Sequence, residues 1–228
     1  VLIKISILKM LKNLVLTLHN STKRDYLQRM NDKKILCMRV AKKYGKDYWD
    51  GKRRFGYGGY KYLPGRWKKI AKKIITTYKL KPGSKILDVG CGKGYLLKEM
   101  LLIEPNLKIT GIDSSSYAIK HSIKCKNLNI FRCKAEKKFP FKNNYFDLVI
   151  SLATLHNLEI KNLEKSIKEI ERVGKKKYIM LESYRNNKEL FNLQCWALTC
   201  NSFFSKNEWV WIYKKFGYKG DYEFIYFK

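Results

Sequence analysis

The chain has 228 residues, 45% of them apolar and 30% charged, which suits one well-packed domain and excludes a disordered chain. Its formal net charge of +30 comes from 49 basic residues, of which only 9 are arginine. The lysines are scattered singly or in short runs, so we interpret the charge as compositional drift, with RNA or an anionic membrane surface as the alternative partner.

The six cysteines form no C-x-x-C pair, so the sequence predicts no zinc or other metal site. No small-residue cleavage site is recognisable near the start of the chain. Abundant free thiols then favour a reducing, cytoplasmic location.

The first 18 residues are apolar but are interrupted by Lys4, Lys9 and Lys12, so they cannot span a bilayer. The remaining apolar residues fall on one helical face, which predicts an amphipathic helix docked on its own domain. A helix is predicted from Thr22 to Tyr44, broken at Asn31, with Asp32 as the cap of its second half.

Residues 45–65 are dense in glycine and aromatic side chains and predict a structured loop, followed by a helix over 66–79. Strands and helices then alternate, which predicts a doubly wound, mainly parallel α/β sheet. The expected strands are 85–89, 108–112, 129–132, 146–152 and 178–181, with helices near 94–103, 115–125 and 161–173. A helix near 206–216 and a strand over 222–227 complete the chain. We divide it into N-terminal helices with a glycine- and tyrosine-rich segment (1–66) and a core with a C-terminal elaboration (67–228).

The stretch 85–97, KILDVGCGKGYLL, is the most informative part of the sequence. A buried strand runs into glycines at 90, 92 and 94, and a helix begins directly after them. Such a loop turns sharply and lets a ligand approach the backbone and the helix N-terminus. The dinucleotide fingerprint G-x-G-x-x-G would need a glycine where Tyr95 stands. The loop resembles that of class I S-adenosylmethionine-dependent methyltransferases, in which an acid such as Asp88 precedes the first glycine.

Further positions between 80 and 182 agree with this resemblance. Asp113 ends the second strand, where the family places an acid for the ribose hydroxyls; as an alternative it caps the next helix. Ala135 and Glu136 match the pair that contacts adenine, and Lys134 stands where the family commonly has an acid. The resemblance implies a Rossmann-like core that binds S-adenosyl-L-methionine and releases S-adenosyl-L-homocysteine.

The fourth strand leads into residues 151–157, which the resemblance places beside the transferred methyl group. This stretch lacks the proline-containing tetrad of nucleic-acid amino methyltransferases and the nucleophilic cysteine of pyrimidine-carbon enzymes. His156 and Glu182 are the candidate catalytic residues, as a base or as groups that orient the acceptor. His156 packing over the cofactor, or Glu182 in a local salt bridge, are the alternatives.

The segment 55–67 precedes the core, where similar enzymes carry a variable lid, and it is expected to close over the cofactor. Tyr60 is predicted to face the sulfonium, and Arg66 a carboxylate. The predicted cofactor site comprises Tyr60, Arg66, Asp88, Gly90, Cys91, Gly92, Asp113, Ser114, Ala135, Glu136, Ser151 and Leu152.

The sequence therefore predicts a methyltransferase that acts on an oxygen or nitrogen atom of a small-molecule metabolite. An RNA methyltransferase is one alternative, favoured only by the charge. A catalytically silent cofactor-binding or interaction module is the other. The acceptor and the oligomeric state stay open at this point.

Overall fold

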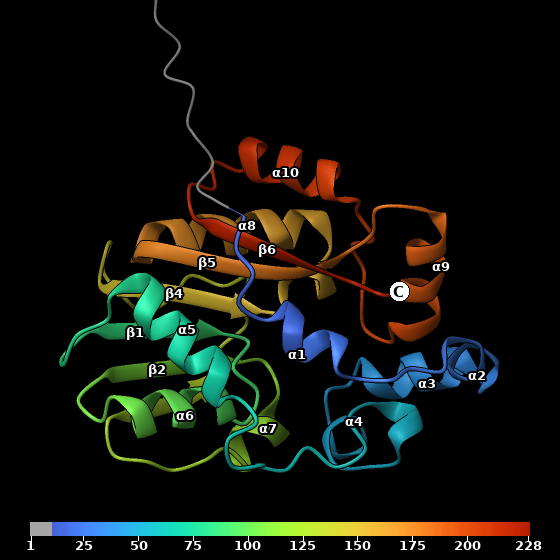
Figure 1. Ribbon diagram of the computed structural model, residues 1–228, viewed down its shortest axis with the longest axis horizontal. Coiled ribbons are helices and arrows are strands. Elements are labelled where there is room, and N and C mark those ends of the chain that lie inside the picture. Colours follow the sequence, from blue (N-terminus) through green and yellow to red (C-terminus); the bar gives the residue numbers. More distant parts are fainter. Residues whose placement is uncertain (1–10) are drawn as a thin grey trace, which may run out of the picture.

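A six-stranded sheet lies at the centre of the computed structural model, which describes residues 11–228 (Figure 1). Its strands are β1 (Lys85–Val89), β2 (Lys108–Asp113), β3 (Leu128–Arg132), β4 (Phe146–Leu152), β5 (Gly174–Ser183) and β6 (Asp221–Tyr226). Their order is β3-β2-β1-β4-β5-β6, and all neighbouring strands are parallel. The predicted doubly wound parallel sheet is confirmed.

The order of strands reverses between β1 and β4, because β2 and β3 extend the sheet on one side and β5 and β6 on the other. The carboxyl ends of parallel strands share one edge, and a crevice opens there where the order reverses. Since β1 and β4 are buried on both faces, as their Leu-, Val- and Ile-rich sequences predict, the crevice stands on a rigid base.

Helices cover both faces of the sheet (Figure 1). On one face lie α5 (Lys68–Tyr78) and α6 (Tyr95–Ile103), which bury Ile74 and Met100 completely. On the other lie α8 (Ile160–Val173) and α10 (Lys206–Lys215), which bury Ile167 and Trp209. The apolar spacing in the sequence predicted the first and last residues of these four helices to within two positions.

Three elements differ from their predicted form. The helix expected over 115–125 is α7 (Ser116–Lys120); it ends early because the chain turns back and the N–H of Ile123 donates to the carbonyl of Lys93. Strand β5 begins at Gly174, before the predicted start at residue 178, because the lysines at 175–177 interrupt the apolar pattern. Helix α9 (Asn187–Trp196) was not predicted, although Asn186 caps it by accepting from the N–H of Glu189.

A helix was predicted over residues 1–18, but residues 11–15 of this range are not helical. Leu11 forms an isolated parallel bridge with Tyr222 beside β6, and the helix α1 spans only Leu16–Asn20. Buried Glu223 accepts the N–H groups of Leu14, Val15 and Leu16 at 2.6, 3.0 and 2.8 Å. Glu223 thus satisfies backbone N–H groups at the start of α1, which begins at Leu16. Ile7 and Leu8, part of the predicted apolar face, lie outside the described residues.

The N-terminal cap, residues 26–55, gathers beyond the carboxyl edge of the sheet beside α9 (Figure 1). It contains α2 (Tyr26–Asn31), α3 (Lys34–Ala41), α4 (Lys46–Trp49) and the 3-10 turn η1 (Arg53–Phe55). The predicted break at Asn31 is confirmed. Asp32 does not cap α3, since Lys33 occupies that position in a left-handed conformation; Asp32 pairs with Arg54 at 2.6 Å instead.

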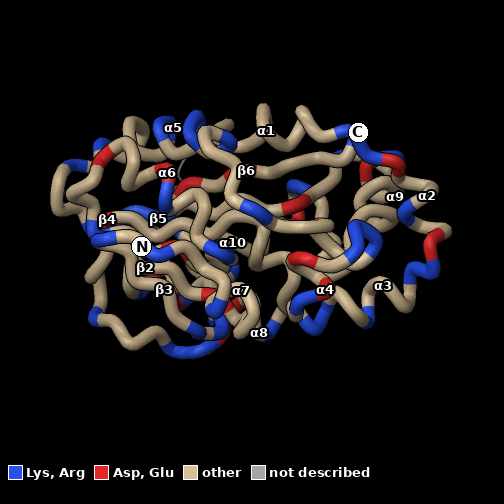
Figure 2. The backbone as a smooth tube through the Cα atoms, turned by 90° about the horizontal axis from the view of Figure 1, so that it is seen from below, with Lys and Arg blue, Asp and Glu red and all other residues tan. Residues whose placement is uncertain are grey.

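Lysine and arginine lie on most elements of the backbone (Figure 2), as the scattered charge of the sequence predicts. Within residues 11–228, no helix is both long enough and apolar enough to cross a bilayer.

Candidate active site

A cavity of about 650 Å³ opens at the carboxyl edge of the sheet, where the strand order reverses. Core loops form one wall and the N-terminal cap forms the other. Of the predicted cofactor residues, those that line this cavity are Gly90, Asp113, Ser114, Ala135, Glu136 and Leu152. A volume of this size holds a nucleoside-sized ligand.

The first glycine of the loop lies tightly against the segment after β4. Gly90 has a φ of +87°, and a Cβ there would lie 2.1 Å from Thr154 Oγ1. Neighbouring Ala153 holds a left-handed conformation, with a φ of +52°. The two crossover loops at the strand reversal are therefore packed directly onto each other, and only glycine fits at position 90.

Gly92 has a different neighbour from the one expected. A Cβ at this position would lie 2.9 Å from the indole of Trp49, so the cap rests directly on the loop. Trp49 Nε1 donates to Ser115 Oγ at 2.9 Å and to the carbonyl of Tyr44 at 3.1 Å. The absent side chain of Gly92 thus makes room for Trp49 of the cap.

Asp113 ends β2 and faces the cavity. Its Oδ2 accepts the N–H of Gly92 at 2.9 Å, and its Oδ1 accepts the N–H of Ser115 at 2.8 Å. Burial raises the pKa of Asp113, and these backbone donors oppose that shift. A carboxylate has about four acceptor positions, so two stay available to hydroxyl groups in the cavity.

Asp88 is a buried residue of β1, two positions before Gly90. Its Oδ1 has no hydrogen-bond partner among the described residues. Burial and the nearby charge of Asp113 raise the pKa of Asp88 to about 8. An unpaired buried carboxyl oxygen is costly, which makes this atom a natural acceptor for a cationic ligand group.

Two predicted cofactor residues point elsewhere. The thiol of Cys91 packs beneath the loop against Gly111 and Leu97, and its N–H bonds the carbonyl of Ile112. Ser151 is fully buried and donates to the carbonyl of Val89 at 2.8 Å. Neither side chain lines the cavity, and both fit a role in joining neighbouring strands.

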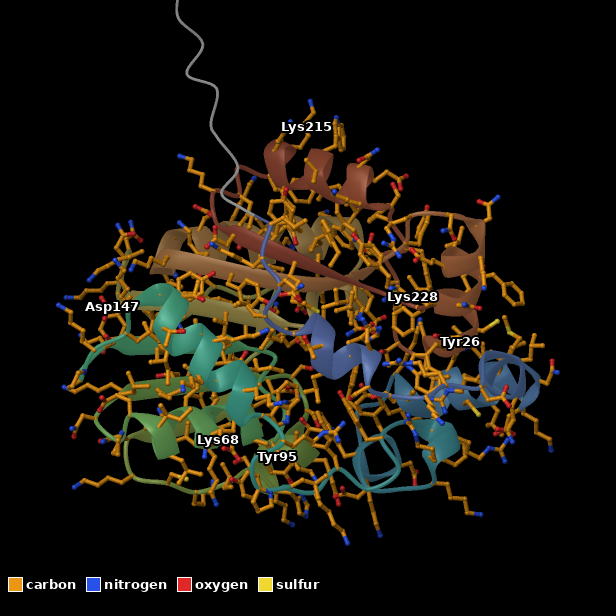
Figure 3. All side chains as sticks on the ribbon, in the orientation of Figure 1. Tyr26, Lys68, Tyr95, Asp147, Lys215 and Lys228 are labelled. Carbon is orange, nitrogen blue, oxygen red and sulfur yellow. The ribbon has the colours of Figure 1, made fainter. Side chains whose placement is uncertain are left out.

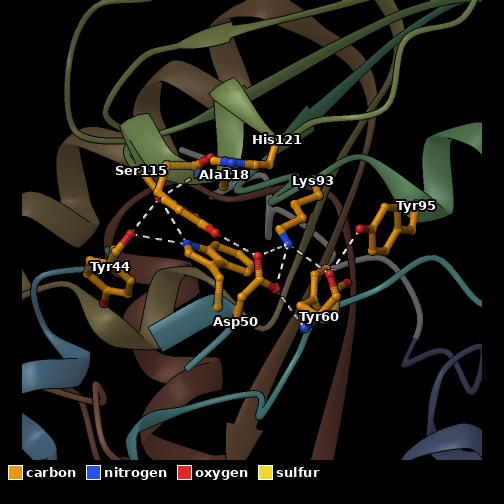
Figure 4. Close-up of polar contacts among 10 residues, drawn as sticks. Tyr44, Asp50, Tyr60, Lys93, Tyr95, Ser115, Ala118 and His121 are labelled. Carbon is orange, nitrogen blue, oxygen red and sulfur yellow. Dashed lines mark hydrogen bonds and ion pairs between the residues drawn. The ribbon is translucent and has the colours of Figure 1, made fainter. Parts of the chain in front are cut away.

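The segment 55–67 is docked on α6 and the glycine loop (Figure 4). The carbonyl of Tyr60 accepts from Lys93 Nζ at 2.8 Å and from Tyr95 Oη at 2.9 Å, and its ring stacks on that of Tyr95. Gly65 N–H donates to Glu99, 2.8 Å away. Arg66 is exposed. Tyr60 thus contacts the loop, and neither Tyr60 nor Arg66 lines the cavity.

His156 lies in the turn η2 (Leu155–Asn157) after β4, and Glu182 lies near the end of β5. Glu182 Oε2 lies 3.4 Å from His156 Nε2, and the N–H of Glu182 lies 3.5 Å from Nδ1. Burial lowers the pKa of His156, an effect that Glu182 partly reverses. If Nδ1 accepts, the proton of the neutral ring sits on Nε2 and points at Glu182. His156 therefore orients the carboxylate, which is the more exposed of the two groups. Neither side chain is among those that line the cavity.

Several cavity residues were not singled out from the sequence. Tyr44, Tyr48 and Trp49 come from the cap, and only Tyr57 belongs to the segment that was predicted to be a lid. Thr154 and Asn157 carry no motif of their own and are found only from their position after β4. The unpredicted lining residues include Tyr44, Tyr48, Trp49, Tyr57, Tyr117, Thr154 and Asn157. Residues 11–228 contain no group of three or more metal-ligating side chains.

Comparison with known proteins agrees with this geometry. A protein-family model described as a methyltransferase domain matches residues 80–219. The chain is similar in fold to a putative methyltransferase from Bacillus halodurans, with a TM-score of 0.54 at 19% identity over 64% of this chain and 68% of that one.

Two curated proteins are similar in sequence. Ribosomal RNA small subunit methyltransferase C of Buchnera aphidicola is 34% identical over 128 residues, which make up 52% of this chain and 37% of that protein. The protein named arginine-hydroxylase NDUFAF5 of Rattus norvegicus is 31% identical over 109 residues, or 48% of this chain and 31% of that protein. The chain spans about a third of the length of these relatives.

Proposed function

Because the chain belongs to the class I S-adenosylmethionine-dependent methyltransferases, we propose that it transfers a methyl group to an oxygen or nitrogen atom of a small-molecule metabolite. The observation that carries the proposal is the presence of two carboxyl groups, those of Asp88 and Asp113, at the strand reversal. Asp113 faces the cavity with free acceptor positions, and Asp88 keeps an unpartnered oxygen beneath the loop.

These residues fit the family's cofactor. Asp113 would accept the two ribose hydroxyls, and Ala135, Glu136 and Leu152 would border the adenine and the sulfonium end. Asp88 would face the cationic amino group. Tyr60 would lie near the amino-acid end of the cofactor, since its carbonyl binds Lys93 of the loop, and Arg66 would pair with the carboxylate. When bound, S-adenosylmethionine supplies an electrophilic methyl group that an acceptor atom attacks in line.

Glu182 would take the proton from the acceptor. Its carboxylate is held from behind by His156 and its carbonyl by Trp209 Nε1, at 3.2 Å. This double support fixes the carboxylate at the strand end without consuming both of its oxygens. Most of the rate acceleration would come from holding acceptor and methyl group in line, and proton removal would add to it.

An RNA acceptor is the second candidate, supported by the ribosomal RNA methyltransferase among the relatives and by the charge. A small acceptor is favoured because Tyr44, Tyr48 and Trp49 of the cap form a wall of the cavity and so restrict the space for an acceptor. The absence of a proline tetrad at 151–154 supports the same choice. Six free cysteines support our proposal of a reducing compartment such as the cytoplasm.

The test is transfer of labelled methyl groups from S-adenosylmethionine into a metabolite extract, with and without ribonuclease treatment. We expect label in the low-molecular-weight fraction, unchanged by ribonuclease and lost in the variant Asp113→Ala. Label confined to RNA would establish the second candidate. No label, from a protein that binds S-adenosylhomocysteine, would identify a silent cofactor-binding module.

A further inference from the structure

Three arginines surround one tryptophan where the N-terminal cap meets α9. The guanidinium carbons of Arg24, Arg29 and Arg53 lie 5.4, 5.1 and 5.1 Å from the ring of Trp196. Figure 3 shows the side chains that crowd this end of the molecule around Tyr26, whose ring lies 6.3 Å from the same indole. We call Arg24, Arg29 and Arg53 the arginine cluster.

The cluster keeps donors that nothing in the described structure uses. Arg24 donates to the carbonyls of His19 and Thr22, and Arg29 donates to those of Arg53 and Arg54. The Nε atoms of Arg24 and Arg29 are buried and have no partner. Arg53 donates from Nη1 to the carbonyl of Gly56 and is open to solvent. Arg29 and Arg53 therefore keep donors for a ligand, whereas both Nη atoms of Arg24 are engaged with His19 and Thr22.

No carboxylate forms a direct ion pair with the cluster in the described part of the chain. Within residues 11–228, no carboxylate oxygen lies within 4.0 Å of any of its three guanidinium groups. Residues 1–10 contain no aspartate or glutamate. Of the other arginines in this part of the chain, Arg54, Arg172 and Arg185 pair with a carboxylate. The cluster differs from the remaining unpaired arginines in that its three charges lie together around one indole ring.

The cluster is electrostatically strained. Burial lowers the pKa of all three guanidinium groups, and the charge of Arg53 lowers those of Arg24 and Arg29 further. Nearby Lys34 adds a fourth cation, whose pKa falls to about 8 through burial and the charge of Arg29. Contact with an indole face relieves only part of this cost. A bound anion would relieve much more.

The cluster lies beside the candidate active site without lining its cavity. A Cβ at Gly58 would lie 2.9 Å from Arg53 Cδ, and the preceding residue, Tyr57, lines the cavity. The charge of Glu182 also raises the pKa of Arg24. Tyr48 and Tyr57 line the cavity and also interact electrostatically with Arg29 and Arg53. A ligand between these tyrosines and Glu182 would thus have cations on its outer side.

We propose that the arginine cluster binds an anionic group, a phosphate or a carboxylate, of the small-molecule methyl acceptor. This inference rests on the proposed function and specifies its substrate class. The planar guanidinium fork suits bidentate recognition of an oxyanion, and the indole holds the three forks in place. The acceptor is then anchored at the cluster, and its nucleophilic atom lies near Glu182.

The test is calorimetric titration with inorganic phosphate, and separately with acetate, at constant ionic strength and with saturating S-adenosylhomocysteine. We expect saturable binding, and the tighter of the two probes shows which oxyanion the cluster prefers. Arg53→Gln and Arg29→Gln should each weaken binding about tenfold or more. Arg39→Gln removes the same charge from an exposed position on α3 and should change the affinity less than twofold.

Equal affinities in Arg53→Gln, Arg29→Gln and Arg39→Gln would overturn the inference, as would the absence of saturable binding to a protein that still binds S-adenosylhomocysteine. In both cases the proposed function survives. Failure of the wild-type chain to bind S-adenosylhomocysteine would contradict the proposed function. Phosphate titration without the cofactor would still test whether the arginine cluster binds an anion. Displacement of phosphate by a short RNA that itself becomes methylated would contradict the small-molecule assignment.

Discussion

Asp50 and Lys93 form an ion pair that joins the N-terminal cap to the cofactor loop. Lys93 Nζ lies 2.7 Å from both carboxylate oxygens of Asp50, and Lys93 is almost fully buried between the second and third glycines of the loop (Figure 4). Asp50 also accepts from Tyr117 Oη and from the N–H of Tyr60. One carboxylate therefore ties the cap, the loop, α7 and the segment 55–67 together.

Removal of the Lys93 charge should destabilise the protein, because it leaves Asp50 partly buried without its cation. For Lys93→Met we expect a loss of about 2–4 kcal/mol in the free energy of unfolding, measured by urea denaturation. The double variant Asp50→Asn, Lys93→Met should lose less than the sum of the single variants. Additive losses would show that the pair is not coupled.

The parts of the fold and site that are local in sequence could be predicted. A few neighbouring residues are enough to recognise the glycine spacing, the acid at Asp88 and the strand that ends at Asp113. Alternating apolar segments predicted the parallel sheet for the same reason. Helix α9 escaped because its main signal is the cap at Asn186, and its apolar spacing is weak.

Contacts between distant segments could not be predicted. Trp49 reaches Ser115 across 66 residues, and Arg53 reaches Trp196 from a different part of the chain. The cluster was not predicted because its arginines come from three separate places: the loop before α2, α2 itself and the turn η1. The inward direction of the Cys91 thiol is likewise set by Gly111, a residue of the next strand.

Binding of the cofactor product should release a proton near pH 7. Asp88 has a pKa of about 8 in the ligand-free protein, so its carboxyl is mainly protonated at that pH. A cationic amino group beside it would lower that pKa and drive the proton off. The heat of binding S-adenosylhomocysteine should therefore depend on the ionisation enthalpy of the buffer. Asp88→Asn should abolish that dependence; a dependence that persists in the variant would assign the proton to another group.

Stability should fall in mild acid through His19. The ring is buried against Phe227, and burial together with the charge of Arg24 lowers the pKa of His19 from 6.5 to about 4. The unfolded chain takes up the proton first. The contribution is therefore complete above pH 6.5 and is lost as the pH falls toward 4, by about 3 kcal/mol at most.

A matched substitution isolates this effect. His19→Gln keeps an acceptor for Arg24 and a donor for the carbonyl of Tyr226, but cannot titrate. Urea denaturation of the variant should show a smaller loss between pH 7 and pH 4 than the wild type. Identical pH profiles would mean that His19 does not govern acid stability.

Substitutions of Glu182 and of His156 should lower kcat to different extents. Glu182→Gln should lower kcat by about 10²- to 10⁴-fold while the affinity for S-adenosylhomocysteine stays unchanged. His156→Gln removes only the group behind the carboxylate, so a smaller loss of kcat and an altered pH profile are expected. If His156→Gln is the more damaging of the two in a folded protein, the imidazole is the base.

The most direct measurement is calorimetric binding of S-adenosylhomocysteine and of NAD to the wild-type chain and to Asp113→Ala. We predict binding of S-adenosylhomocysteine only, and a loss of at least tenfold in the variant, since the carboxylate would accept two hydroxyl groups at about 1.5–3 kcal/mol each. Thermal unfolding of the variant serves as the control for its fold. Binding of NAD without S-adenosylhomocysteine, or wild-type affinity in folded Asp113→Ala, would contradict the cofactor site described for this chain.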